Sequence, residues 1–446
     1  MRRHLTNAGF GVVDYVSYPA GMLLVAPIVL HRLGSAEYGL WMIATAVISA
    51  GGILASGFCD ACIQRVAAHR GSCAFDRMRD AVRSMLAINL VTGTLLGAAV
   101  WAGAPYAARH AGAAQTISPA ECQAALRIAS AAILVRAMES VGVGVQRAFE
   151  RYRATVQISA ATRLLTLASA AVLAMLGCRT AAILVATVVW LALGTIAQFR
   201  QAGKLIGNFG PRRGPESSET RALFGLGFFA WVQAAGGVVY AQLDRILLGI
   251  SLGAATVTPY SLCVQFAHPV FGLTASGLNF LFPYLSGRAG ALSASSLRVT
   301  LLKAFACNLA LVVCGVGALL LIGDRLIRIW AGPAVAQRAA PILLPIVAGA
   351  ALTGLGVTGT YALQALGQFR SVAWISLAGR GAMLLMMSEL LRHRGVQGLA
   401  LSRLFYGAVS LLVYIPLLQQ LKPSRDAARM AAALPGPVSA QEGSNL

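Results

Sequence analysis

Long apolar runs, separated by short polar connections, make up most of this chain of 446 residues. A helix that crosses a bilayer needs about 20 mostly apolar residues, and twelve segments meet that requirement. The first six cover residues 5–30, 38–58, 85–105, 125–145, 155–177 and 180–199. The second six cover residues 223–248, 257–282, 301–323, 341–363, 371–391 and 398–421. The pattern predicts an all-α polytopic membrane protein whose first segment is a retained helix rather than a signal peptide.

The longest polar connection, a basic stretch that contains GPRRGPESSE, divides the twelve segments into two sets of six. We therefore expect an N-terminal six-helix bundle at residues 1–200 and a cytoplasmic linker at 201–221. A C-terminal six-helix bundle at 222–421 and a disordered cytoplasmic tail at 422–446 complete the predicted organisation.

The two halves carry a weak internal repeat. The motif Arg153, Ile158-Ser159, Arg163 recurs as Arg370, Ile375-Ser376, Arg380, and Leu33-Gly34-Ser35-Ala36 recurs as Leu252-Gly253-Ala254-Ala255. Both matches have nearly the same offset along the chain, which is close to half its length and spans six helices. Both halves therefore enter the membrane in the same direction. Parallel repeats of this kind place a substrate site between the halves of a transporter. Two packed bundles without a cavity are the alternative.

Composition excludes a soluble globule and a disordered chain. Apolar residues make up 57% of the chain and charged residues 11%, against about 25% charged in soluble proteins. The net charge of +21 comes from short basic bursts rather than a Lys/Arg-rich run, so it indicates membrane topology and not nucleic-acid binding. Alternate connections hold 22 and 10 basic residues, which predicts cytoplasmic termini on the richer side.

Catalytic and metal-binding patterns are not evident in the sequence. The eight cysteines include Cys59 and Cys62 at C-x-x-C spacing, but no second Cys/His pair follows at a zinc-finger distance. We interpret the cysteines as small apolar core residues and predict no metal, cofactor or disulfide framework. The connections between the helices are too short for an extramembrane catalytic domain, so we predict that the chain is not an enzyme.

Four arginines lie well inside predicted spans, away from the basic residues counted at the connections: Arg136, Arg163, Arg380 and Arg403. Arg163 and Arg380 each lie ten residues past a boundary arginine, or about 15 Å deep, at equivalent places in the two halves. An ionised side chain at mid-membrane faces a cavity or a partner. We predict that the four bind an anionic substrate, because guanidinium groups bind phosphate oxygens in pairs. The alternative is structural pairing of Arg136 with Glu139, and of Arg380 or Arg403 with Glu389.

Acidic residues inside the spans are few. Asp14 is the candidate ion-coupling carboxylate of the first half, since a buried carboxyl group can exchange protons near neutral pH. An interfacial position near the end of the first helix is the alternative. Asp244 is expected to form a local ion pair with the adjacent Arg245.

Several segments resemble the polysaccharide-export branch of the multidrug/oligosaccharidyl-lipid/polysaccharide superfamily. PIVLHRLGSAEYGLWMIATAV resembles the turn that joins the family's first two helices. AQLDRILLGISLGAATVTPYSL resembles its signature between helices seven and eight, with Asp244, Gly249, Gly253 and Tyr260 in the expected places, and FPYLS resembles the end of helix eight. The resemblance covers nearly the whole chain and is more specific for the superfamily than for the substrate.

The resemblance implies a repeat-unit flippase of the Wzx type in the bacterial inner membrane. Such a protein moves an undecaprenyl-diphosphate-linked oligosaccharide of an O-antigen or exopolysaccharide from the cytoplasmic to the periplasmic leaflet. Its partners would be that lipid-linked glycan and the bilayer, and the resemblance leaves open a polysaccharide polymerase of the same pathway. Two alternatives remain: a cation-coupled multidrug exporter that depends on Asp14, and a membrane polymerase or ligase.

Overall fold

The computed structural model describes residues 2–71, 73–111, 117–149, 151–207, 231–232, 235–278, 281, 285, 294–366 and 368–420, with most side chains from residue 21 onward. Within these ranges the chain is helical and contains no strand. Eight helices are long and apolar enough to cross a membrane: 21–55, 75–109, 119–148, 153–175, 180–206, 296–331, 333–365 and 370–420. Most of the predicted linker and all of the predicted tail lie outside the described residues.

The described part of the first half contains six helices. They are α1 (Arg2–Ala55), α2 (Cys59–Gly71), α3 (Phe75–Ala111), α4 (Pro119–Ala148), α5 (Tyr152–Met175) and α6 (Thr180–Ile206). α1 contains the first two predicted spans, which meet at Gly34, where the backbone leaves the helical conformation with φ 81° and ψ 172°. α2 was not predicted: it is a short helix whose Cys62 and Val66 are buried in a cluster with Met78 and Val82 of α3.

In the second half, the first described residues are 231–232 and 235–238, which are helical and precede the π-helical turn η2 (Val239–Leu243). The following elements are α8 (Asp244–Leu252), α9 (Ala254–Gly277), α11 (Ala294–Ala331), α12 (Pro333–Ala365), α13 (Phe369–Ser410), η3 (Leu411–Val413) and α14 (Tyr414–Gln420). α13 contains the eleventh predicted span and the start of the twelfth, which meet at Gly395 with φ 55° and ψ −133°. Ten of the twelve predicted spans coincide with these membrane-length helices, and α1 and α13 each join two consecutive spans. The eighth predicted span corresponds to α9, but the last part of that span and much of the seventh (223–248) lie outside the described residues.

The predicted repeat is visible in the helix ends and in the turns. α4 ends at Ala148 and α12 at Ala365, while α5 begins at Tyr152 and α13 at Phe369. Both pairs of helix ends have the same offset along the chain as Arg163 and Arg380. Gly34 and Gly253, equivalent in the repeated LG motif, have φ values of 81° and 84°. Both halves thus follow the same backbone path at these points.

A pair of buried asparagines extends this symmetry to side-chain bonds. Asn89 of α3 donates to the Ala137 carbonyl at 2.7 Å and to the Ser140 hydroxyl at 2.8 Å. Asn308 of α11 donates to the Gly354 carbonyl at 3.0 Å and to the Thr358 hydroxyl at 2.9 Å. Each bond fixes the third helix of its half against the fourth, so the two halves share an internal packing scheme.

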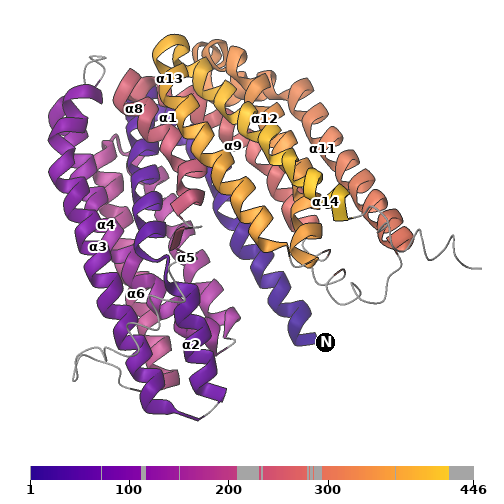
Figure 1. Ribbon diagram of the computed structural model, residues 1–446. Coiled ribbons are helices and arrows are strands. Elements are labelled where there is room, and N and C mark those ends of the chain that lie inside the picture. Colours follow the sequence, from indigo (N-terminus) through magenta and orange to yellow (C-terminus); the bar gives the residue numbers. More distant parts are fainter. Residues whose placement is uncertain are drawn as a thin grey trace, which may run out of the picture.

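The two halves meet at one end and diverge toward the other (Figure 1). They approach each other near α8, where the Thr258 hydroxyl of α9 donates to the Ser35 carbonyl of α1 at 2.6 Å. Gly39 permits this contact, because a Cβ there would collide with the Ala254 carbonyl oxygen. Toward the end that carries the N-terminus, the helices of the two halves separate in the ribbon view.

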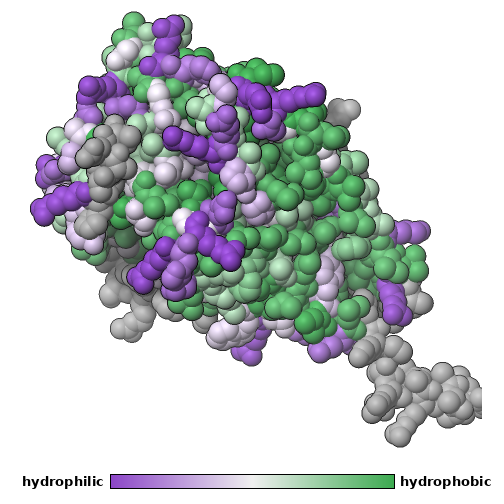
Figure 2. All heavy atoms as spheres, turned by 90° about the horizontal axis from the view of Figure 1, so that it is seen from above, coloured by the Kyte–Doolittle hydropathy of each residue, from purple (hydrophilic) through white to green (hydrophobic). Residues whose placement is uncertain are grey.

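The outer surface suits a lipid environment. Hydrophobic residues cover much of one flank, while hydrophilic residues gather over the end seen in Figure 2. α11 is the clearest case: only 11% of its most apolar window is buried, and Leu321 and Ile329 are 80% and 82% exposed. Such apolar exposure is stable in contact with acyl chains and not in water.

The cysteines match their predicted role only in part. Cys62, Cys122 and Cys263 are buried, whereas Cys73, Cys307 and Cys314 are exposed, so the prediction of core residues is wrong for the latter three. Cys307 and Cys314 lie on the lipid-facing helix α11, where an exposed apolar thiol is compatible with acyl chains. All eight cysteines are free.

Candidate functional site

A polar cavity of about 380 Å³ lies inside the first half, between the end of α1, α4 and α5. It contains three arginines and one glutamate, and it includes two of the four arginines singled out in the sequence. The cavity is lined by Ser49, Gly52, Ile53, Ser56, Gly57, Cys59, Arg136, Glu139, Ser140, Val143, Arg147, Ser159 and Arg163. We call it the arginine cavity. It lies toward the end of the bundle opposite Gly34, because Arg147 is in the last turn of α4.

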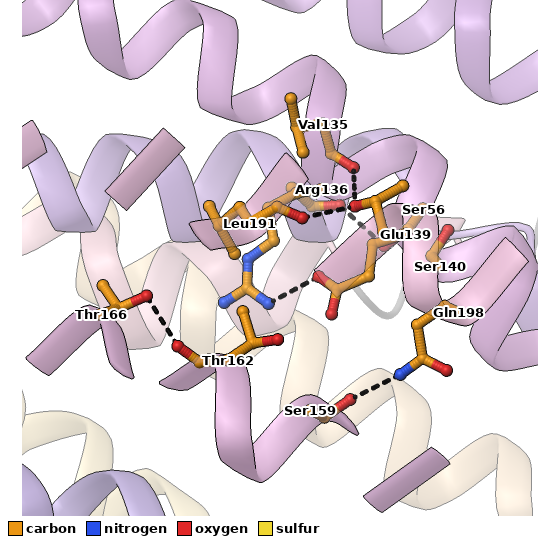
Figure 3. Close-up of polar contacts among 12 residues, drawn as sticks. Ser56, Val135, Arg136, Glu139, Ser140, Ser159, Thr162, Thr166, Leu191 and Gln198 are labelled. Atoms are coloured by element: carbon orange, nitrogen blue, oxygen red, sulfur yellow. Dashed lines mark hydrogen bonds and ion pairs between the residues drawn. The ribbon is translucent and has the colours of Figure 1, made fainter. Parts of the chain in front are cut away.

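The structure contains the ion pair of Arg136 with Glu139 that was the alternative to a substrate contact. Nη1 of Arg136 lies 3.2 Å from Oε2 of Glu139, one turn along α4 (Figure 3). The Glu139 side chain is only 8% exposed, while that of Arg136 is 35% exposed and faces the cavity. Three guanidinium groups and one carboxylate line this space, so the lining carries an excess of positive charge that favours an anion.

A buried hydrogen-bond network supports this cavity from behind. Gln198 of α6 donates through Nε2 to the Ser159 hydroxyl at 3.1 Å (Figure 3), and its Oε1 accepts from Gln146 of α4. Thr155 donates to Oε1 of Gln146 at 3.1 Å. The network fixes α5 against α4 and α6, and so it fixes Arg163, one turn beyond Ser159.

Sequence reasoning missed this network. Its signal was present: Gln146 and Gln198 are uncharged polar residues at the ends of apolar spans, and both are completely buried. Buried amides need hydrogen-bond partners, so isolated glutamines in such segments indicate contacts between helices.

A second pocket, of about 220 Å³, lies between α9, α12 and α13. It is lined by Phe271, Ala275, Thr353, Gly356, Val357, Thr360, Tyr361, Val372, Ile375, Ser376, Arg380, Tyr406, Ser410 and Val413. We call it the hydroxyl pocket. Ser376 and Arg380 occupy the positions that Ser159 and Arg163 occupy in the arginine cavity, so the repeat places one arginine of each half in equivalent cavities.

Arg403 lies elsewhere. It is 7% exposed, and its Nε is 2.7 Å from Oδ2 of the fully buried Asp244. The Tyr260 hydroxyl donates to the same oxygen at 2.6 Å and accepts from Nε of Arg403 at 2.9 Å. Arg403, Asp244 and Tyr260 therefore form a buried triad that joins α13, α8 and α9, and Arg403 lines neither the arginine cavity nor the hydroxyl pocket.

Two predicted ion pairs are corrected by these contacts. The carboxylate of Asp244 pairs with Arg403 rather than with the neighbouring guanidinium of Arg245, whose backbone N–H it accepts at 2.7 Å. Glu389, the alternative partner for Arg380 or Arg403, lies 3.0 Å from His393 at the next turn of α13 and pairs with neither arginine. Helix packing sets the Asp244–Arg403 pair, which no local pattern reveals, whereas the Glu389–His393 pair follows from a spacing of four residues on one helix.

The role of Asp14 stays a prediction. Asp14 lies within α1, but its side chain is outside the described residues. Among the residues that the structure describes, no three His, Cys, Asp or Glu side chains come together as metal ligands.

A family model described as polysaccharide biosynthesis protein matches residues 29–332, which is more than half of the chain. The chain belongs to this family. Membership confirms the resemblance drawn from the sequence, and the matched range includes the turn at Gly34, the AQLDRILLGISLGAATVTPYSL and FPYLS segments and the whole arginine cavity. No curated protein sequence matches the chain closely enough to count as a relative.

Solved structures similar to this member of the polysaccharide biosynthesis family share its fold at low sequence identity. The lipid II flippase MurJ in an inward closed conformation has a TM-score of 0.72 at 12% identity, with 95% of this chain and 90% of that chain covered. An inward-facing multidrug resistance MATE transporter of the MOP superfamily has a TM-score of 0.68 at 13% identity, covering 95% and 99%. These similarities establish the twelve-helix MOP fold.

Proposed function

We propose that this protein is a flippase for undecaprenyl-diphosphate-linked oligosaccharide. It moves the repeat unit of an O-antigen or exopolysaccharide from the cytoplasmic to the periplasmic leaflet of a bacterial inner membrane. Membership of a polysaccharide biosynthesis family supports the pathway, and the fold shared with a lipid II flippase and with multidrug transporters supports a transporter rather than an enzyme.

The arginine cavity carries the proposal. Arg136, Arg147 and Arg163 line one space inside a bundle that is otherwise apolar enough to span a membrane. A diphosphate offers oxygen acceptors that match the paired N–H groups of guanidinium, and arginine stays charged when it is desolvated. The polar head of the substrate would bind here while its isoprenoid tail stays in the lipid between the halves.

The arrangement of the halves supports a state that is open toward the cytoplasm. The halves are joined near Gly34 and Gly253, at the end that basic-residue counting assigns to the periplasm, and Arg147 lies toward the opposite end. Alternating access then requires the Thr258–Ser35 contact to open.

Reconstituted vesicles test this function. We expect the wild type to expose undecaprenyl-diphosphate-oligosaccharide to an outside glycosidase, and the Arg136→Gln/Arg163→Gln variant to do so at least about tenfold more slowly. Charge-assisted hydrogen bonds are worth about 1.5–3 kcal/mol each, and about 1.4 kcal/mol corresponds to tenfold. Arg127→Gln is the matched control, because Arg127 lies on the same helix but stacks on Trp101 outside the cavity.

A cation-coupled multidrug exporter is the second candidate, favoured by the similarity to MATE transporters. The positive lining of the arginine cavity disfavours a cationic drug. Transport of ethidium by the same vesicles, without movement of the lipid-linked glycan, would replace the flippase proposal with this one.

A further inference from the structure

The hydroxyl pocket has the backbone frame of the arginine cavity but different chemistry. With the offset that relates Arg163 to Arg380, Arg136 corresponds to Thr353, Glu139 to Gly356 and Val143 to Thr360. Ser159 and Arg163 keep their types, as Ser376 and Arg380. Because the helix ends and the asparagine bonds match between halves, the difference lies in the side chains that face each space.

Hydrogen-bond direction shows what the hydroxyl pocket can accept. Thr353 donates its hydroxyl proton to the Gly349 carbonyl at 2.8 Å, and Thr360 donates to the Gly356 carbonyl at 3.0 Å. Ser410 donates to the Gly407 carbonyl at 2.6 Å, and Tyr361 donates to the Ala275 carbonyl at 3.1 Å. With these protons committed to helix carbonyls, the oxygens have only lone pairs to offer a ligand.

A lining of hydrogen-bond acceptors favours the sugar of the proposed substrate over its diphosphate. A diphosphate oxygen only accepts hydrogen bonds, so it would meet lone pairs at these four hydroxyl groups. A sugar hydroxyl donates a proton and also accepts one, so it can donate to Thr360 or Thr353 and accept from the Arg380 guanidinium. The lining holds one arginine, against three in the arginine cavity, beside these four acceptor oxygens. The pocket therefore favours a neutral polyhydroxylated ligand over a phosphate.

The walls and the size of the pocket agree with a sugar ring. Tyr406, which is 7% exposed, Tyr361 and Phe271 provide apolar surface beside the hydroxyl groups, the usual combination in small-molecule sites. The volume of about 220 Å³ is below the roughly 300–1,000 Å³ of sites for drug-sized ligands. It suits one sugar unit and not a complete oligosaccharide.

We propose that the hydroxyl pocket is a sugar subsite, which binds one unit of the glycan while the arginine cavity binds the diphosphate. This inference rests on the proposed flippase function. Each repeat would then bind a different part of the substrate. The first half binds the diphosphate, which all undecaprenyl-diphosphate lipids share, and the second half recognises the sugar. Substrate specificity accordingly resides in Thr353, Thr360, Ser376 and Tyr406.

Binding measurements in lipid nanodiscs test the division. The probes are undecaprenyl diphosphate and the same lipid bearing one glucose, galactose or N-acetylglucosamine. We expect the wild type to bind at least one glycosylated probe more tightly than the bare lipid. Thr360→Val/Ser376→Ala removes two hydroxyl groups with little change in volume. It should weaken binding of that probe about tenfold and leave binding of the bare lipid unchanged.

Two comparisons make the result decisive. Arg163→Gln should weaken binding of the bare and glycosylated lipids by the same factor, because both carry the diphosphate. Thr187→Val is the matched control: Thr187 also donates to a carbonyl of its own helix, at 2.9 Å, but lies outside both cavities.

Equal weakening of bare and glycosylated lipid by Thr360→Val/Ser376→Ala would overturn the sugar subsite. So would a wild type that binds all four probes equally. Either result leaves the flippase proposal standing. Failure of the wild type to bind any undecaprenyl diphosphate would instead refute the flippase proposal itself.

Discussion

Arg403 illustrates how a buried arginine can be structural. Its guanidinium contacts Oδ2 of Asp244 through both Nε and Nη2, at 2.7 and 2.5 Å, and Tyr260 completes the contacts of that oxygen. Every charge in the triad is offset by a neighbour, so no charge remains for a ligand. Arg136 differs, since its side chain is 35% exposed to a cavity that holds two further arginines.

The triad predicts a stability effect that separates these roles. Arg403→Met leaves the Asp244 carboxylate buried without its cation, and removal of one partner of a buried pair costs about 3–5 kcal/mol. We expect the variant to show a clearly lower thermal midpoint in detergent. The double variant Asp244→Asn/Arg403→Met removes both charges and should recover most of that loss.

Transport by the double variant then assigns Arg403. A folded double variant that still flips lipid-linked glycan shows that Arg403 is a positioning residue of the second half. Loss of flipping with wild-type stability would contradict this assignment and return Arg403 to the substrate ligands predicted from the sequence.

At the scale of elements, glycines with positive φ mark where consecutive spans join. Gly34 (φ 81°, ψ 172°) and Gly253 (φ 84°, ψ 162°) adopt a region that is essentially restricted to glycine. A Cβ added at Gly34 would have no atom within 4 Å, so the restriction there comes from the backbone and not from packing. The turn between the first two spans therefore depends on this one conformational property.

We predict that Gly34→Ala destabilises the protein by about 1–3 kcal/mol, the cost of holding another residue in that region. The thermal midpoint of the purified protein measures the effect. Gly103→Ala is the matched control, because Gly103 lies inside α3 and also has open space around its Cβ position. The control should be neutral or slightly stabilising, since alanine favours the helix. Equal midpoints for the two variants would contradict the argument from backbone strain.

Sequence patterns predicted the elements whose signals are local. Apolar runs located the spans, the repeated LG motif located two equivalent turns, and a separation of three residues identified the Arg136–Glu139 pair. α2 was missed because its 13 residues are fewer than a bilayer requires, although Phe58, Cys62 and Val66 follow helical spacing. Asp244 and Arg403 are 159 residues apart, and no local pattern links residues at such a distance.

At the scale of the whole molecule, sequence patterns likewise predicted the local features of the site but not which residues the packing of distant helices brings together. The sequence predicted that Arg163 and Arg380 are equivalent, and the structure places each in a cavity of its own half. It did not predict that Arg147, counted among the boundary residues, lines the arginine cavity, because the cavity forms only when α1, α4 and α5 pack together. Equivalence between repeats is encoded locally, whereas cavity shape is a property of the assembled bundle.

Sidedness is the molecular property on which the direction of transport depends. Cys73 lies between α2 and α3 among the arginines of the basic-rich connection, and it is exposed. Cys178 is half-buried in the turn between α5 and α6. Three helices that can span a membrane, α3, α4 and α5, separate these cysteines, so the two thiols should lie on opposite membrane faces.

We predict that a membrane-impermeant maleimide labels a Cys178-only variant in cells with a permeabilised outer membrane. A Cys73-only variant should be labelled only after the inner membrane is opened, because basic connections stay in the cytoplasm. A Cys307-only variant is the control for thiols in lipid: Cys307 is exposed on the lipid-facing helix α11, where acyl chains keep out a water-soluble reagent, and it should resist labelling in both conditions. Labelling of Cys73 in cells with an intact inner membrane would mean that the true topology is the reverse of the predicted one. The arginine cavity would then open to the periplasm. A flippase that loads its substrate from the cytoplasmic leaflet is incompatible with that orientation, so the labelling experiment also constrains the direction of transport.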